Sequence, residues 1–255
     1  MPIITCRDVA LQFTNDQTPV LDQIQLDIQE GEFVSILGKS GSGKTTLLQL
    51  LGGLLSPTKG VIKVLGRTLT SPFDEITYVF QKPILLEWRN VLENVLIPLE
   101  LKRKPNQDDI DKAYQVLSAV GLKQHVTKYP HELSGGMMSR VTLARAFLME
   151  PKILLMDEPF SALDAMTKEQ LHLVLLKLTQ QFSTTTVFIT HDITEATYLS
   201  DRVVLLGGYP AHVKQEFPVT FSRPRSKKLT FDSRFIATTK QLYDLIEGLE
   251  DDEKD

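Results

Sequence analysis

Cysteine is almost absent from this sequence of 255 residues, and long hydrophobic runs are missing as well. The single cysteine, Cys6, cannot form a disulfide within the chain or a metal site built from several cysteines. The longest stretches without a charged residue, 45–58 and 178–191, are shorter than the roughly 20 apolar residues that a membrane-spanning helix requires. We therefore expect neither a disulfide framework nor a transmembrane segment.

An excess of basic residues is also missing. Lysine and arginine number 28 against 32 acidic residues, a formal net charge of −4. A general nucleic-acid binder needs a basic face for phosphate contacts, so nucleic acid is not an expected partner. The segment 1–7 does not place basic residues before an apolar stretch, and no secretory signal is expected. The cytosol is therefore the simplest compartment.

Short apolar runs without alternation are present instead, as in strands buried on both faces of a parallel sheet. The predicted strands are Phe33–Leu37, Ile153–Met156, Val187–Thr190 and Val203–Leu206. Helices are predicted over Thr45–Leu54, Gly135–Met149 and Ala165–Phe182. Strands that alternate with helices over short joints predict an α/β fold, in which helices cover a parallel sheet.

Three regions depart from this alternation. Residues 1–30 alternate between apolar and polar side chains, which predicts a small antiparallel sheet. Residues 86–149 carry helical patterns only and are expected to form an inserted helical subdomain. Its helices are predicted over Asn90–Leu101, Asp108–Val120 and Gly135–Met149. Toward the C-terminus we expect one amphipathic helix, Phe235–Leu249, and an acidic end, 250–255, that frays.

The strongest local pattern follows the predicted strand Phe33–Leu37. It reads Gly38-Lys39-Ser40-Gly41-Ser42-Gly43-Lys44-Thr45, then Thr46, and fits the phosphate-binding loop between a strand and a helix. Glycines let backbone N–H groups close around a phosphate, and a helix N-terminus favours the anion. Lys44 would reach the β- and γ-phosphates, and Thr45 would ligate Mg²⁺. A plain glycine-rich turn is the alternative, but the strand–helix setting favours nucleotide binding.

Two carboxylates, Asp157 and Glu158, follow the predicted strand Ile153–Met156. Buried carboxylates need a cation or protons to offset their charge. Because successive strand residues point to opposite sides, Asp157 would hold Mg²⁺ while Glu158 acts as general base toward the attacking water. A solvated pair at a strand end is the alternative, which the phosphate-binding loop disfavours.

The segment Leu133-Ser134-Gly135-Gly136-Met137 resembles the LSGGQ signature of ABC transporter ATP-binding subunits. Further motifs match this family in its order: Gln81 as the Q-loop glutamine, Asp164 at the end of the D-loop Ser161–Asp164, His191 as the switch histidine, and Phe13 as the aromatic that stacks on adenine. For Phe13, a half-buried strand aromatic is the alternative. The resemblance implies an α/β P-loop NTPase core of the ABC ATPase type.

The same resemblance implies a domain organisation. A RecA-like ATP-binding core with an N-terminal antiparallel β subdomain would comprise 1–85 and 150–220. The inserted α-helical subdomain, 86–149, would carry the signature, and 221–255 would form a C-terminal helical tail.

Site roles follow from the resemblance as well. Two copies of the chain would enclose two ATP molecules with Mg²⁺. In each site, Glu158, His191 and Gln81 would be catalytic, and Thr45, Gln81 and Asp157 would hold the metal. The signature residues 133–137 and Asp164 would come from the partner copy. The other histidines, His125, His131, His172 and His212, are expected to be ordinary core or surface residues.

The segment 81–91 is similar to a stretch of nitrate, sulfonate and taurine importer ATPases, although Glu87 replaces a proline there. The segments 159–165, 190–196 and 223–225 agree with this subgroup, as does a methionine at position 137. The resemblance implies the ATPase of an importer for such a solute. A thiamine-precursor pyrimidine or another small solute, or a non-transport ABC ATPase, are the alternatives.

Such an importer implies partners in other chains. The ATPase subunit would form a homodimer, bind membrane permease subunits, and act indirectly with an extracytoplasmic solute-binding protein. It would lie at the cytoplasmic face of the cell membrane as a peripheral protein. Trp88 is a candidate anchor for a permease helix, with packing inside the helical subdomain as the alternative.

Overall fold

A six-stranded sheet lies at the centre of the fold, in the order β10-β9-β3-β8-β7-β6. The computed structural model describes residues 1–14 and 18–251. The strands are β3 Phe33–Leu37, β6 Ile76–Val79, β7 Ile153–Asp157, β8 Thr185–Ile189, β9 Arg202–Gly207 and β10 His212–Pro218. Neighbouring strands pair in parallel except β10, which is antiparallel to β9. Strands β3 and β8 are buried along their whole length, as expected for central strands of a parallel sheet.

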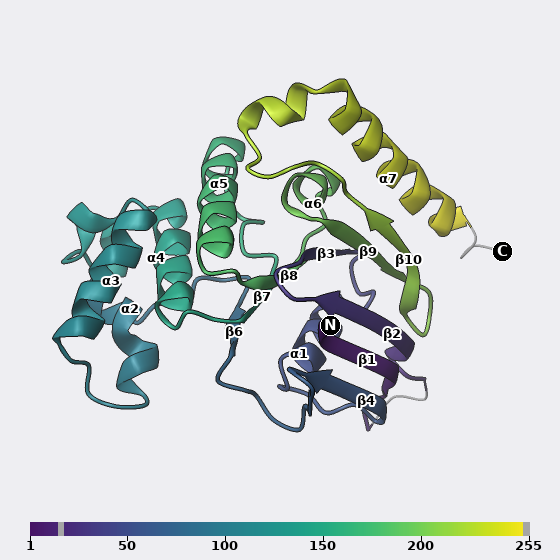
Figure 1. Ribbon diagram of the computed structural model, residues 1–255, viewed down its shortest axis with the longest axis horizontal. Coiled ribbons are helices and arrows are strands. Elements are labelled where there is room, and N and C mark those ends of the chain that lie inside the picture. The colour runs from purple at the N-terminus through teal and green to yellow at the C-terminus, as the bar shows by residue number, and fades with distance from the viewer. Residues whose placement is uncertain (15–17, 252–255) are drawn as a thin grey trace.

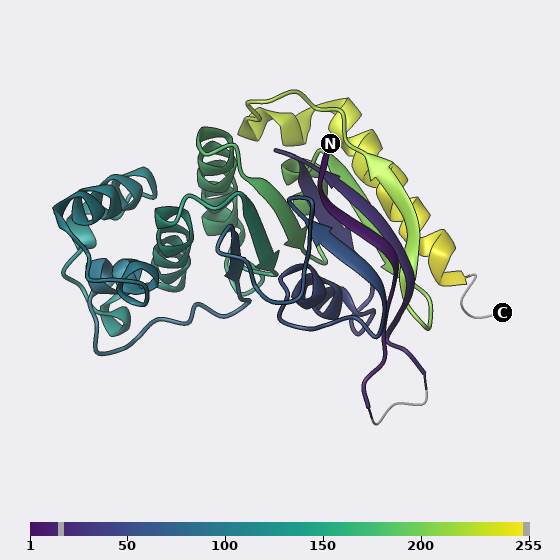
Figure 2. The ribbon, with the colours of Figure 1, turned by 60° about the horizontal axis from the view of Figure 1, so that its bottom comes forward.

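A four-stranded antiparallel sheet, in the order β2-β1-β4-β5, packs beside the first (Figures 1 and 2). Its strands are β1 Pro2–Leu11, β2 Leu21–Gln29, β4 Lys59–Val64 and β5 Arg67–Thr68. Ile4 and Ile28 of this sheet share a core with Val34 of β3 and Leu47 of helix α1, Lys44–Leu51. The predicted α/β class with an N-terminal antiparallel sheet is confirmed.

Helices α2, α3 and α4 form a lobe at one end of the molecule (Figure 1, left). They span Val91–Glu100, Gln107–Ala119 and Gly135–Leu148, with short 3-10 helices at Lys123–His125 and Pro130–Glu132. Asn90 and Asn106 begin α2 and α3, each with its side chain accepting from a backbone N–H of the first turn. The inserted helical region is therefore present, while its boundaries at 86 and 149 remain predictions.

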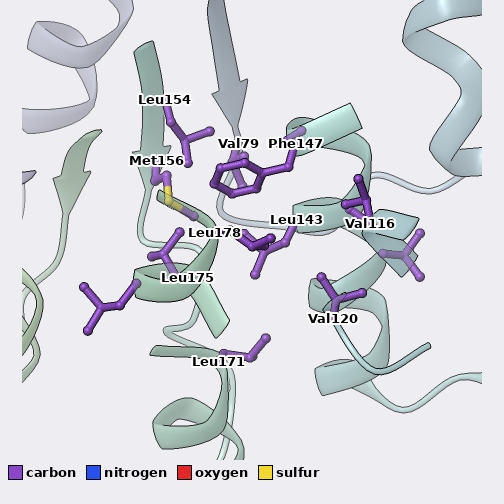
Figure 3. Close-up of a cluster of buried hydrophobic side chains, with 14 of the residues drawn as sticks. Val79, Val116, Val120, Leu143, Phe147, Leu154, Met156, Leu171, Leu175 and Leu178 are labelled. Atoms are coloured by element: carbon purple, nitrogen blue, oxygen red, sulfur yellow. The ribbon is translucent and has the colours of Figure 1, made fainter. Parts of the chain in front are cut away.

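A shared apolar core joins this lobe to the sheet (Figure 3). Phe147 and Leu143 of α4 face Met156 of β7 and Leu175 of helix α5, which spans Ala165–Gln181. The same cluster continues to Val116 of α3. Burial of these side chains holds the start of α4, where the signature lies, next to α5.

Several elements differ from the sequence predictions. Strand β8 starts at Thr185, before the predicted strand 187–190, because buried threonines extend it; the Thr185 hydroxyl accepts a hydrogen bond from the Gly31 N–H at 2.9 Å. Strands β6 and β10 lie at the two sheet edges and are only partly buried, so their apolar patterns are weak. Helix α6, Ile193–Leu199, was also not predicted.

The C-terminal segment covers one side of the six-stranded sheet (Figure 1). A 3-10 helix, Lys227–Phe231, precedes helix α7, Ser233–Asp251, which extends the predicted helix 235–249 at both ends. Leu242 of α7 is buried against the sheet residue Leu37. Of the acidic end expected to fray, residues 252–255 lie outside the described part of the chain. None of the helices in the described ranges is long and apolar enough to cross a bilayer.

Candidate active site

The loop of residues 38–43 carries the chain from β3 into α1, and two of its positions require glycine. A Cβ at Gly38 would lie 2.3 Å from the carbonyl oxygen of Leu206 in β9, so any side chain there would collide with backbone. Gly43 has a φ of 82°, a left-handed conformation that glycine adopts readily. The loop thus leads directly to the N-terminus of α1, where backbone N–H groups lack helical partners.

Lys44 is held over this loop by backbone carbonyls. Its Nζ donates to the carbonyl oxygens of Gly38 at 2.8 Å and of Lys39 at 2.6 Å. The residue is only 7% exposed. Burial lowers the pKa of Lys44, while the nearby carboxylates of Glu158 and Asp157 raise it. A partly desolvated ammonium beside a helix N-terminus is suited to bind an anion.

The predicted Mg²⁺ ligands Thr45 and Asp157 lie side by side. The Thr45 hydroxyl donates to Asp157 Oδ1 at 3.2 Å. Burial raises the pKa of Asp157, the Thr45 hydrogen bond lowers it, and the negative charge of Glu158 raises it further. A divalent cation would relieve this crowding of negative charge, and hydroxyl and carboxylate oxygens are ligands that Mg²⁺ prefers.

Protein groups alone would not complete that metal site. Among the described residues, no group of three or more His, Cys, Asp or Glu side chains could hold a metal ion. Mg²⁺ commonly binds through one or two carboxylates together with substrate phosphates and waters. The pair of Thr45 and Asp157 beside the phosphate loop therefore fits a metal that arrives with a nucleotide.

Glu158 and His191 contact each other across the ends of β7 and β8. His191 Nδ1 lies 3.2 Å from Glu158 Oε2. The Glu158 backbone N–H donates to the carbonyl oxygen of Ile189 at 3.1 Å, and its φ is 43°. Such a left-handed backbone is costly for a residue with a side chain and is concentrated at functional sites. From this backbone position the Glu158 carboxylate faces the His191 ring.

Gln81 joins the same group through the loop after β7. Its Nε2 donates to the Ser161 hydroxyl at 3.4 Å, and that hydroxyl donates to the Glu158 carbonyl oxygen at 3.0 Å. Gln81 follows β6, which neighbours β7 in the sheet. Residues from four distant segments therefore meet at the carboxyl ends of the parallel strands, where ligands bind in such sheets.

The signature and the D-loop form a second set, at the starts of α4 and α5. The Ser134 side chain caps α4 by accepting from the Met137 N–H at 3.3 Å. Asp164 Oδ1 caps α5 by accepting from the Thr167 N–H at 3.0 Å. Hydrogen bonds with Thr167 lower the pKa of Asp164. Leu133 and Met137 pack against the core that joins the lobe to the sheet.

Gly136 allows α4 and α5 to approach each other. A Cβ at this position would lie 2.4 Å from Thr167 Cγ2, whereas a Cβ at Gly135 would lie 3.5 Å from Leu163, an ordinary contact. We expect Gly136→Ala to destabilise the chain by about 1–3 kcal/mol through overpacking, although alanine normally favours a helix. Urea unfolding would measure the change.

Matched variants separate this contact from a general effect of the substitution. Gly135→Ala should leave the unfolding free energy unchanged or raise it. Thr167→Ala should relieve most of the loss when combined with Gly136→Ala, because it removes the colliding methyl group. A Gly136→Ala protein as stable as the wild type would show that the Thr167 methyl group moves aside without cost or that the helices do not meet this closely.

Phe13 lies beyond the end of β1 rather than within it, and it is 43% exposed. The alternative of a half-buried strand aromatic is therefore wrong. Its stacking on adenine remains a prediction, as do the site roles of Thr46 and the loop residues.

Sequence reasoning missed the buried neighbours of His191. Thr190 and Glu195 are 2% and 5% exposed, and Glu195 binds His172. His172 is a buried, partnered residue, as its default interpretation predicts. One sequence pattern could have indicated helix α6. Asp192 and Glu195 stand at its N-cap and in its first turn, where acidic residues mark a helix start.

The chain is similar in sequence to proteins of known families. The ABC transporter family profile matches residues 21–161. The taurine import ATP-binding protein TauB of Shigella boydii is 41% identical, over 86% of this chain and 88% of its own length. The nitrate import ATP-binding protein NrtD of a Synechocystis species is 38% identical over 91% and 90%. The aliphatic sulfonates import ATP-binding protein SsuB of Bacillus thuringiensis is 40% identical over 82% of each chain.

The fold matches a solved cassette as well. A dimeric ATP-binding cassette in a post-hydrolysis state, bound to ADP and phosphate, superimposes with a TM-score of 0.75 at 32% identity. The match covers 86% of this chain and all of the cassette. The family profile, the relatives and the matching fold all indicate the same family as the motifs at residues 38–45 and 133–137. The chain therefore belongs to the ABC transporter family, among its ATP-hydrolysing subunits.

Proposed function

We propose that this ATPase acts as a homodimer around two MgATP and drives solute uptake through separate membrane permease subunits. The solute would be of the nitrate, sulfonate and taurine class. The observation that carries the proposal is that Lys44, Asp157, Glu158 and His191 come together at the carboxyl ends of the parallel strands. The chain is also about 40% identical to importer subunits for these solutes.

In the proposed reaction, ATP phosphates bind at the loop 38–43 and at the Lys44 ammonium. The ammonium then donates to phosphate oxygens in place of its two backbone carbonyl partners. Thr45, Asp157 and Gln81 would hold Mg²⁺, which neutralises charge that develops on the phosphates. Glu158 accepts a proton from the attacking water as general base. His191, whose Nδ1 lies 3.2 Å from Glu158 Oε2, would stand beside the γ-phosphate and offer it a hydrogen bond from the ring.

The second half of each site would come from the partner copy. Ser134 and Gly136 stand at the N-terminus of α4, an anion-binding helix end. Asp164 stands at the start of α5 beside them. A head-to-tail dimer would bring this pair of helix starts to the partner's nucleotide. The dimeric cassette with ADP and phosphate supports such an arrangement.

A groove between the sheet edge and the helical lobe fits a permease contact. It holds about 380 Å³ and is lined by residues including Phe73, Leu101 and Arg145. Leu101 is 83% exposed, and Arg145 donates to the Ile84 carbonyl oxygen at 2.6 Å. Trp88, in the loop between β6 and α2 and outside the lining of this groove, is 74% exposed, so packing inside the helical lobe is wrong for this residue. We place the protein, as a proposal, at the cytoplasmic face of the membrane through this groove.

Trp88→Ala should uncouple transport from hydrolysis. We expect the purified variant to hydrolyse ATP within about twofold of wild type, because Trp88 lies outside the reacting groups. Uptake by the assembled transporter should fall about tenfold or more, the scale of losing one aromatic anchor. Wild-type uptake by the variant would exclude Trp88 from the coupling surface.

The partners themselves provide the test of the whole proposal. The tagged chain would be purified from mildly solubilised membranes of its native host, and the proteins that accompany it identified. A multi-span permease and a solute-binding protein would support the importer, and screening that binding protein against nitrate, sulfonates and pyrimidines would name the solute. Ribosomes or DNA-repair factors would instead favour a non-transport ATPase.

A further inference from the structure

A buried chain of hydrogen bonds runs from helix α5 to the loop that carries His191. His172 Nε2 lies 2.6 Å from Glu195 Oε1, and the Thr190 hydroxyl donates to Glu195 Oε2. The Thr190 hydroxyl also accepts from the Asp192 N–H at 3.0 Å. The residues on both sides of His191 are therefore linked to one buried carboxylate through the Thr190 hydroxyl.

His191 itself has little else to hold it. Its side chain is 61% exposed, and its ring nitrogen Nδ1 faces Glu158 Oε2 at 3.2 Å. An exposed ring can keep one position only if its backbone is fixed. The Asp192 side chain contributes by accepting from the Thr194 and Glu195 N–H groups at the start of α6. The buried chain and this cap together leave the loop 190–192 little freedom.

His172 also contacts the segment that carries Glu158. Its ring lies 5.7 Å, centroid to centroid, from Phe160, which is 1% exposed and follows Glu158 by two residues. The ring lies 6.0 Å from Tyr198 on its other side. One buried imidazole thus touches both segments on which the proposed general base and switch histidine stand.

We propose that His172, through Glu195 and Thr190, is a positioning residue for His191 and Glu158. The inference rests on the proposed roles of those two residues and adds a group that touches no nucleotide. His172 stands on α5, whose first turn is capped by Asp164. A shift of α5 would therefore reach His191 through the Glu195 hydrogen bond, which links the D-loop to the switch within one subunit.

Two substitutions of His172 separate the hydrogen bond from the packing. His172→Phe keeps a ring beside Phe160 but leaves Oε1 of the buried Glu195 without its partner, while the Thr190 hydroxyl still donates to Oε2. His172→Gln loses the ring but keeps an N–H donor near the Nε2 position. We expect His172→Phe to lower kcat about tenfold to a hundredfold, with KM for ATP within about twofold, because small misplacements of reacting groups cost that much. His172→Gln should retain most of the activity.

Threonine variants test the other end of this series of hydrogen bonds. Thr190→Val keeps the shape of the side chain but removes the hydroxyl between Glu195 and Asp192, so kcat should fall as for His172→Phe. Thr194→Val makes the same change at an exposed position on α6 and should have no effect. Urea unfolding shows which variants are folded. If His172→Phe does not fold, the activity of Thr190→Val decides the proposal.

The outcomes distinguish this inference from the proposed function. In a His191→Ala background, His172→Phe should lower single-turnover hydrolysis by much less than in the wild type, since only its effect on Glu158 remains. Loss of activity in His191→Ala with wild-type activity in both His172→Phe and Thr190→Val would overturn the positioning role and leave the proposed function intact. Wild-type activity in His191→Ala would reject the switch role itself, and with it this inference. Independent, multiplicative losses would mean that His172 is only structural.

Discussion

Replacing Glu158 with glutamine is expected to reduce ATP turnover by about 100-fold to 1,000-fold while MgATP still binds, because only the acceptor for the proton of water is removed. Glutamine has the same shape, and the backbone bond from residue 158 to Ile189 does not involve the side chain. The contact with His191 can also be kept by an amide. ATP-dependent dimers should therefore accumulate, which light scattering after gel filtration would detect.

Glu30→Gln is the matched control for this variant. Glu30 is exposed at the end of β2, so the same loss of charge should leave turnover unchanged. Phosphate release and equilibrium binding of MgATP would be measured on both proteins. Undiminished turnover in Glu158→Gln would reject the general-base assignment, and equal losses of binding and turnover would mean that Glu158 acts mainly in nucleotide binding.

Lys44→Ala should weaken ATP binding by about 100-fold or more, the equivalent of two or three charge-assisted hydrogen bonds. The Lys44 ammonium already stands over the loop, 2.8 Å and 2.6 Å from two carbonyl oxygens. Little ordering is therefore required when phosphate oxygens replace those partners. Titration of the protein with a fluorescent ATP analogue, displaced by ATP, would give the dissociation constant.

Lys63→Ala removes the same charge at an exposed position on β4 and should bind ATP as the wild type does. Urea unfolding without nucleotide would show whether Lys44→Ala remains folded. Because burial disfavours the Lys44 ammonium, its removal should cost little stability. An affinity for ATP within about twofold of wild type would place the phosphates away from Lys44.

Local sequence patterns predicted the elements that are buried on all sides. Strand β3 was predicted with its observed bounds, and β7 differs only by one residue at its end. The phosphate loop and the signature were recognised because each depends on a short, contiguous set of residues. Partly buried edge strands such as β10 escaped prediction, since water on one face permits polar residues that break the apolar pattern.

Contacts between distant segments could not be predicted in the same way. Gln81 and Ser161 are 80 residues apart, and His191 and Glu158 are 33 apart. Sequence spacing does not indicate which strands are neighbours, so the resemblance to a family had to supply their common site. The exposure of Trp88 and Phe13 likewise depended on packing that neither residue type decides.

By itself the sequence determined the α/β class, the phosphate loop, the carboxylates after β7 and the family, because each is recognised from short runs or motifs of contiguous residues. Only the tertiary structure decided how these parts act together. It places the Glu158 carboxylate beside His191, brings α4 against α5 at Gly136, and places His172 between the segments that carry Glu158 and His191. The physical reason is that parallel strands bring their carboxyl ends to one edge, where residues from remote segments come within hydrogen-bond distance.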